Sequence, residues 1–79
     1  MQKNEIVDRL GHNIRAERMK RNISQEKLAE MTGMHKNYIG IIERGEKNVT
    51  VLRCFQIAQA LNIPLTDLVP LTDQTIEKE

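Results

Sequence analysis

Aromatic residues and cysteine are scarce in this chain of 79 residues. It has one Phe, one Tyr and no Trp. Stacking of bases on aromatic side chains therefore cannot be its main binding mode, which argues against a single-strand nucleic-acid binder. Its single cysteine, Cys54, excludes a disulfide within the chain and favours a reducing compartment, so we expect cytoplasmic localisation.

Long apolar runs and catalytic patterns are missing as well. No stretch approaches the roughly 18 apolar residues of a membrane span, and the first residues form no apolar signal segment. The two histidines, His12 and His35, do not combine with Cys54 into a metal site of suitable spacing. No Ser-His-Asp set and no phosphate-binding glycine loop occurs. We therefore expect no membrane partner, no enzyme, no cofactor, no metal and no small-molecule ligand.

The length and composition predict one small domain. Since hydrophobic residues make up 39% and aromatics 3%, the core must be aliphatic. We predict a single domain over residues 1–79, with a core at about 6–69 and a flexible, polar tail at 71–79.

Charge is unevenly distributed, although the net charge is only +1. Residues 1–53 hold 11 Lys or Arg and 7 Asp or Glu, a balance of +4, whereas residues 54–79 hold 1 and 4, a balance of −3. The N-terminal part could face phosphate groups, but surface solubilisation would give the same distribution.

Apolar periodicity predicts an all-α, five-helix bundle without strands. The expected helices are residues 6–21, the stretch from the Ser24 cap to Gly33, residues 36–44, residues 51–61 after the Thr50 cap, and a short stretch between Pro64 and Pro70. The fourth should bury Val51, Cys54, Phe55, Ala58 and Leu61 on one broad face.

The second and third of these helices form a helix-turn-helix pattern, because a tight turn containing Gly33 joins them. In the third helix, Ile39, Ile42 and Glu43 should face inward. The outward face then carries Asn37, Gly40, Ile41 and Arg44.

That outward face suits the major groove of DNA. Asn can pair with adenine, Arg can bond guanine or phosphate, and an aliphatic side chain can touch a thymine methyl. Gly40 costs about 1 kcal/mol relative to alanine inside a helix, which close approach of another backbone would justify. Alternatively, Ile41 packs on a neighbouring helix or a partner subunit, and Gly40 lets helices approach.

Several segments resemble the Cro/repressor-like helix-turn-helix family of transcriptional regulators. They are QEKLA at 25–29, Gly33, YIGIIERG at 38–45 and AQALN at 58–62, and the resemblance covers about residues 6–69. In size the chain is similar to the controller proteins of restriction–modification systems, with small phage and antitoxin regulators as close competitors. The resemblance implies a lambda repressor-like DNA-binding domain of five helices that binds palindromic operators in double-stranded DNA as a homodimer.

The resemblance also implies roles for individual residues. The residues that would reach base edges are His35, Lys36, Asn37, Gly40 and Ile41. Arg44 is added to this set because it lies on the same outward face. Those that would contact phosphate are Gln25, Tyr38, Lys47 and Asn48. Arg18 and Glu43 would form a buried ion pair, and periodicity also places both on inward faces.

The C-terminal part contains more apolar residues than so short a segment can bury alone. Leu65, Leu68, Val69 and Leu71 therefore suggest a homodimer interface. We expect a sequence-specific DNA-binding regulator, such as a repressor or a controller protein. The alternative is a protein-interaction module with the same fold, such as an antitoxin-type partner, which would have no need of Lys36, Asn37 and Arg44 together.

Overall fold

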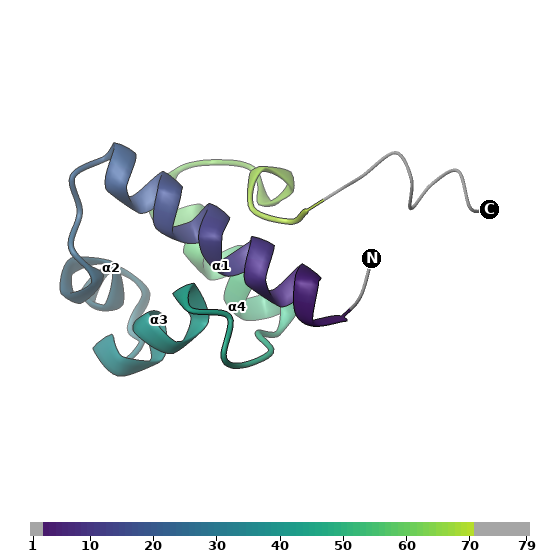
Figure 1. Cartoon of the computed structure of the whole chain (residues 1–79). Helices are drawn as coiled ribbons and strands as arrows, with labels where there is room; N and C mark the ends of the chain where they lie inside the picture. The colour runs from purple at the N-terminus through teal and green to yellow at the C-terminus, as the bar shows by residue number, and fades with distance from the viewer. Residues whose placement is uncertain (1–2, 71–79) are drawn as a thin grey trace.

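The computed structural model describes residues 3–70, which form four α-helices and one short 3-10 helix. The α-helices are α1 (Lys3–Lys20), α2 (Gln25–Thr32), α3 (Lys36–Glu43) and α4 (Val51–Leu61), and the 3-10 helix is η1 (Leu65–Asp67). Figure 1 shows α2 and α3 next to each other on one side of the long helix α1. Since no strand occurs among the described residues, the all-α class is confirmed.

The predicted fifth α-helix is wrong, because the segment between Pro64 and Pro70 forms only η1. Pro64 has an extended backbone (φ −69°, ψ 150°), so the turn begins after it. The amide of Leu68 donates to the carbonyl of Leu65 at 2.9 Å, and Pro70 disfavours the α conformation in the residue before it. Too few residues remain between the two prolines to extend this turn into an α-helix.

The predicted helix caps are confirmed. The hydroxyls of Ser24 and Thr50 each accept a hydrogen bond from a backbone amide in the first turn of α2 and α4, at 2.9 and 3.2 Å. Gly33 and Asn62 end these two helices in the left-handed conformation, with φ of 73° and 60°. Local side-chain chemistry therefore sets the boundaries of both helices.

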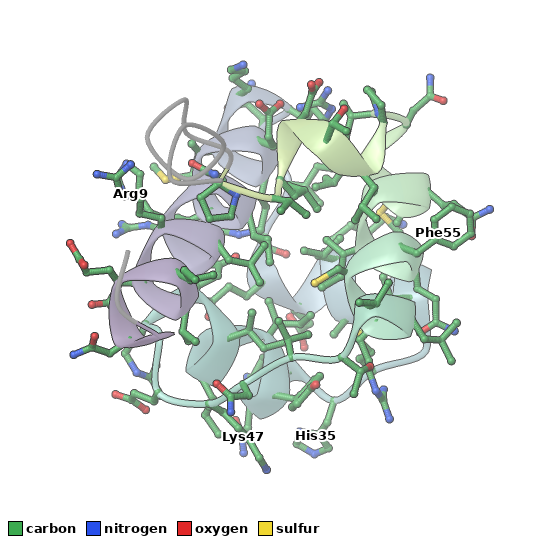
Figure 2. All side chains as sticks on the ribbon, turned by 90° about the vertical axis from the view of Figure 1, so that its right-hand side faces the viewer. Arg9, His35, Lys47 and Phe55 are labelled. Atoms are coloured by element: carbon green, nitrogen blue, oxygen red, sulfur yellow. The ribbon has the colours of Figure 1, made fainter. Side chains whose placement is uncertain are left out.

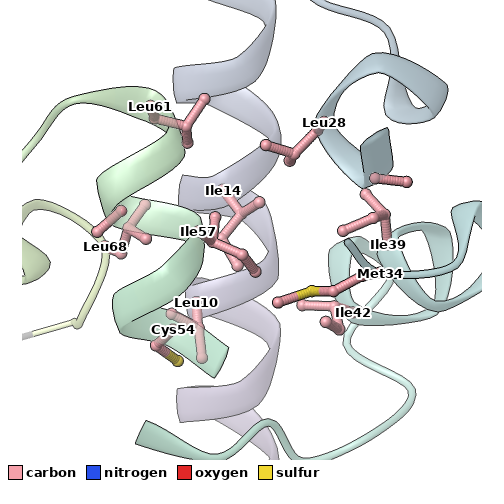
Figure 3. Close-up of a cluster of buried hydrophobic side chains, with 12 residues drawn as sticks. Leu10, Ile14, Leu28, Met34, Ile39, Ile42, Cys54, Ile57, Leu61 and Leu68 are labelled. Carbon is pink, nitrogen blue, oxygen red and sulfur yellow. The ribbon is translucent and has the colours of Figure 1, made fainter. Parts of the chain in front are cut away.

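The core is aliphatic and contains side chains from all four α-helices. Figure 3 shows Ile14 of α1 and Ile57 of α4 at its centre, with Leu28, Ile39 and Ile42 pointing in from α2 and α3. All five of these side chains are buried. Because Ile39 and Ile42 fix one face of α3 in the core, the opposite face must point outward.

The segment after α4 packs back onto its own protomer. Leu68 is fully buried, and the side-chain amide of Asn13 donates to its carbonyl at 2.9 Å. The prediction that Leu68 serves a dimer interface is therefore wrong, because its side chain closes the core of a single chain. Leu65 and Val69 are half-buried, whereas Leu71 and the predicted tail lie outside the described residues.

The inward face of α4 is narrower than predicted. Cys54, Ala58 and Leu61 are buried, but Val51 and Phe55 are 74% and 47% exposed. Phe55 lies about 100° around the helix from Cys54, and Val51 precedes Cys54 by one turn, so both lie at the edges of the buried stripe. An apolar surface thus remains exposed at the start of α4.

A glycine lets α1 approach the end of α3. Gly11 is buried, and a Cβ at this position would lie 2.8 Å from the carbonyl oxygen of Glu43 and would also clash with that of Ile42. Both obstacles are backbone atoms, which cannot rotate away. The two helices therefore require glycine at position 11.

We predict that Gly11→Ala lowers the free energy of unfolding by about 1–3 kcal/mol, since overpacking outweighs the better helix propensity of alanine. Gly40→Ala is the matched control, because the atoms nearest its added Cβ are the ends of the Arg44 and Gln25 side chains. It should leave stability unchanged or raise it by up to about 1 kcal/mol. Urea unfolding of both variants measures the difference, and equal effects would contradict the close contact at Gly11.

A buried ion pair joins α1 to α3, as predicted. The Nε of Arg18 donates to Oε2 of Glu43 at 2.7 Å and its Nη2 to Oε1 at 3.1 Å, while the two side chains are 11% and 2% exposed. The Nη1 of Arg18 donates to the carbonyl of Ile23 at 2.7 Å, and Gln25 donates to Oε1 of Glu43 at 3.0 Å. One carboxylate therefore connects α1, α2 and α3.

Removing either partner should leave an uncompensated buried charge. We predict that Arg18→Met and Glu43→Ala each lower the free energy of unfolding by about 3–5 kcal/mol. Glu30→Ala is the control, because Glu30 forms an exposed pair with Lys27, which should contribute at most about 1 kcal/mol. Thermal melts decide the matter: if all three variants melted within a degree or two of the parent, the buried pair would not stabilise the fold.

Candidate nucleic-acid interface

The turn of the helix-turn-helix is fixed by contacts inside the protein, and one face of α3 remains exposed. The turn runs from Gly33 to His35, and the amide of Met34 donates to the carbonyl of Ala29 at 3.0 Å. The Met34 side chain is buried in the core. The turn is thus fixed both by its backbone and by a core side chain.

The outward face of α3 is hollowed above Gly40. An open depression of about 320 Å³ is lined by Gln25, Lys36, Asn37, Gly40, Ile41 and Arg44. The structure therefore brings together the residues predicted to contact bases, except His35, and adds Gln25 from α2. Gly40 has no side chain, and the side chains of Arg44 and Gln25 lie over it instead.

His35 caps α3 instead of lying within it. Its Nδ1 accepts a hydrogen bond from the amide of Asn37 at 3.1 Å. The bond uses Nδ1 as the acceptor. His35 is exposed, and Nε2 is the ring nitrogen that remains for a ligand.

Gln25 is anchored by the buried ion pair. Its Nε2 donates to Oε1 of Glu43, and its side-chain oxygen and nitrogen would lie 3.6 and 3.8 Å from a Cβ at Gly40. Gln25 therefore forms a fixed wall of the depression, although its amide nitrogen is engaged within the protein. The sequence pattern did not indicate this contact.

Arg44 is held by a carboxylate that the sequence analysis did not single out. Its Nε donates to Oε2 of Glu46 at 2.9 Å and its Nη2 to Oε1 at 3.2 Å. Both side chains are more than half exposed. The hydrogen bonds to Arg44 lower the pKa of Glu46, and the same bonds raise the pKa of Arg44, so the pair stays charged at neutral pH.

Arg53 of α4 adds a further positive charge beside α3. The guanidinium carbon of Arg53, in the first turn of α4, lies 5.2 Å from the centre of the half-buried Tyr38 ring, a cation–π distance. Sequence reasoning missed Arg53 because its nearness to Tyr38 depends on how α4 packs against α3. Thr50 capping places Arg53 in the first turn, but no periodicity connects it to Tyr38.

Lys47 and Asn48 lie in the loop between α3 and α4, and both are exposed. Figure 2 shows Lys47 and His35 projecting from the same edge of the molecule, whereas Phe55 projects from another side. Phe55 therefore points away from the edge that carries Lys47 and His35.

The described residues offer little other chemistry. No group of three or more His, Cys, Asp or Glu in residues 3–70 could hold a metal ion. Cys54 is buried, and burial raises the pKa of its thiol, so it is a poor nucleophile. No helix in the described part of the chain is both long and apolar enough to cross a membrane.

Comparison with known proteins identifies the same motif. The model of the HTH_3 (helix-turn-helix) family matches residues 14–68. Control protein C.SmaI of Serratia marcescens is 43% identical over 75 residues, which cover 95% of this chain and 87% of that protein. Control protein C.BamHI of Bacillus amyloliquefaciens is 41% identical over 63 residues, which cover 78% of each chain.

A solved structure has the same fold. The crystal structure of the restriction-modification controller protein C.AhdI from Aeromonas hydrophila superposes with a TM-score of 0.77 at 34% identity, over 78% of this chain and 94% of that one. The matched family and these relatives are regulators and not enzymes, in agreement with the sequence. The chain therefore belongs to the helix-turn-helix family of transcriptional regulators.

Proposed function

We propose that this protein is a sequence-specific regulator that binds double-stranded DNA by inserting α3 into the major groove, and that it is a controller protein of a restriction–modification system. The observation that carries the proposal is the depression above Gly40, which gathers Lys36, Asn37 and Arg44 on the face of α3 away from the core. Its cytoplasmic localisation follows from this function. The similarity to control proteins over nearly the whole chain supports the controller assignment.

The side chains around the depression match the edges of base pairs. Asn37 can pair with adenine, Arg44 can donate to guanine, and Ile41 can contact the methyl group of thymine. His35 and Lys36 lie at the start of α3, where residues of a recognition helix meet bases. Gly40 lies at the bottom of the depression, where its lack of a side chain leaves room for the Arg44 side chain.

Phosphate groups on either side of the groove would be bound by residues around α3. Gln25 lies at the start of α2, Tyr38 on the flank of α3, and Lys47 and Asn48 in the loop that follows. We add Arg53 to this set, because its guanidinium lies against Tyr38. These contacts fix the protein on the duplex without recognising sequence.

Base contacts and phosphate contacts should fail in different ways. We predict that Asn37→Ala weakens binding to the preferred operator by about 1–3 kcal/mol and relaxes discrimination at one base pair per half-site. Binding to random duplex should hardly change, because phosphate contacts supply that affinity. In contrast, Lys47→Ala should weaken binding to both DNAs and reduce the salt slope by about one unit per protomer.

Titrations of both variants against operator and random duplex at several salt concentrations measure these effects. The operator is first selected from a random pool with the parent protein. If Asn37→Ala weakened both DNAs equally and Lys47→Ala changed the sequence preference, the docking of α3 would be wrong. If neither variant differed from the parent, this face would not bind DNA, and the protein-interaction module would be the better explanation.

We also propose that the protein acts as a homodimer on a two-fold operator, with an interface centred on the start of α4. Val51, Leu52 and Phe55 form an exposed apolar surface there, at successive positions around the helix. With Leu68 buried, Leu65 and Val69 can contribute only their exposed parts. A single recognition helix per chain also favours a dimer.

The dimer is tested by Leu52→Glu. We expect sedimentation at micromolar concentration to show a dimer for the parent and a monomer for the variant, since a charge would be buried in the interface. Met19→Glu adds the same charge at an exposed apolar residue of α1 and should remain dimeric. The recognition helices should meet half-sites about 34–36 Å apart. A parent protein that was strictly monomeric and still bound a lone half-site tightly would overturn the dimer.

A further inference from the structure

The side chain of Arg44 lies between the carboxylate of Glu46 and the backbone of Gly40. Its Nε and Nη2 donate to Glu46 at 2.9 and 3.2 Å, and its Nη1 would lie only 3.2 Å from a Cβ at Gly40. The side chain is therefore folded back across the outward face of α3, where it lines the depression. Glycine at position 40 is what leaves room for it.

The contacts with Glu46 occupy only one edge of the guanidinium. A guanidinium is a planar fork with two edges that can each donate a pair of hydrogen bonds, Nε–Nη2 at the side and Nη1–Nη2 at the end. Glu46 binds the side edge of Arg44. The end edge has the geometry that matches O6 and N7 of guanine in the major groove.

Arg18 shows the contrast with a purely structural arginine. Its three nitrogens all donate within the protein, to Glu43 and to the carbonyl of Ile23, and its side chain is nearly buried. Arg44 is exposed, and the pair that it forms with Glu46 is of the surface type that contributes little to stability. Arg44 is therefore not fixed within the fold as Arg18 is, and part of its guanidinium remains exposed to a ligand.

The ion pair with Glu46 also weakens the attraction between Arg44 and the phosphate groups of DNA. A free arginine is drawn to any phosphate, whereas an arginine that is neutralised by a carboxylate has lost most of its long-range attraction. The contribution of Arg44 to DNA binding then depends on a directional hydrogen bond from the end edge of its guanidinium. Lys36 and Lys47, which are exposed nearby, keep the general attraction to the backbone.

We propose that Glu46 is a specificity-determining residue, which holds the side edge of Arg44 so that the end edge recognises guanine and is withheld from phosphate. This inference rests on the proposed insertion of α3 into the major groove. Glu46 is a positioning residue, because it acts on the DNA only through Arg44.

Glu46→Gln tests the proposal, because it removes the charge and keeps the size. Glu30→Gln is the matched control, since it makes the same change in net charge at another exposed ion pair, with Lys27 on α2. Each protein is titrated at several salt concentrations against the selected operator, random duplex, and an operator in which each guanine in turn is replaced by adenine.

We expect Glu46→Gln to bind random duplex several-fold more tightly than Glu30→Gln does, with a salt slope that is steeper by about one unit per protomer, as for one added phosphate contact. At one guanine per half-site, the preference over adenine should fall about tenfold, which is within the range of one bidentate contact. Glu30→Gln should change its binding to all DNAs by the same small factor and keep the preference for guanine.

Two results would overturn the proposal. If Glu46→Gln strengthened binding to operator and random duplex by the same factor, Glu46 would act only as a general negative charge. If it behaved like Glu30→Gln, the pair would have no part in recognition. These results differ from a failure of the proposed function, in which the parent protein itself would bind no duplex and the selection would yield no operator.

Gly40→Ala provides an independent test with the Glu46 carboxylate intact. The added methyl group would lie 3.2 Å from Nη1 of Arg44, so the guanidinium would have to shift by a few tenths of an ångström. This shift should reduce the preference for the same guanine, while thermal stability is maintained. A Gly40→Ala protein that retained the full guanine preference would show that the position of Arg44 over residue 40 is irrelevant.

Discussion

The arrangement of the helix-turn-helix depends on one buried carboxylate. Glu43 accepts hydrogen bonds from Arg18 of α1 and from Gln25 of α2, while its own helix is α3. Its backbone carbonyl faces Gly11, so α1 also contacts the end of α3 through main-chain atoms. The three helices are therefore connected at a single point, next to the outward face that carries Lys36, Asn37 and Arg44. Because Arg18 and Glu43 are both buried, a change in the angle between α1 and α3 that separated them would leave each charge without its partner.

Much of the fold could be predicted because its determinants are local. The caps at Ser24 and Thr50, and the left-handed residues Gly33 and Asn62, act within one turn of the helix that they end, so sequence neighbours are sufficient to recognise them. The inward and outward faces of α3 follow from the helical period, and the family resemblance indicated the partner of Arg18. In contrast, the two prolines limit the last segment to a 3-10 turn, which a count of apolar residues does not reveal.

The features that sequence reasoning missed depend on tertiary packing. Leu68 was assigned to an interface because a short segment cannot bury it alone, but α1 and α4 supply the cover, with Asn13 fixing the chain. The contact of Arg53 with Tyr38 requires the crossing of α4 and α3. The pair of Arg44 with Glu46 is close in sequence, but it depends on a turn at Gly45 (φ 70°) that brings the two side chains together after α3 has ended.

The first turn of α4 lies between the two proposed binding surfaces. Arg53 contacts Tyr38 on the side of the recognition helix, while Val51 and Leu52 are exposed on the apolar surface, and only Val49 and Thr50 separate this turn from the loop with Lys47 and Asn48. If that turn is the dimer contact, dimer assembly and DNA binding share one helical turn and are thermodynamically linked. Linkage is reciprocal. If binding to an operator strengthens the association of the two subunits by some factor, the association of the subunits strengthens binding to that operator by the same factor. An operator whose half-sites do not match the spacing of the two recognition helices would be bound more weakly by the dimer, so the dimer interface would take part in selecting the DNA sequence.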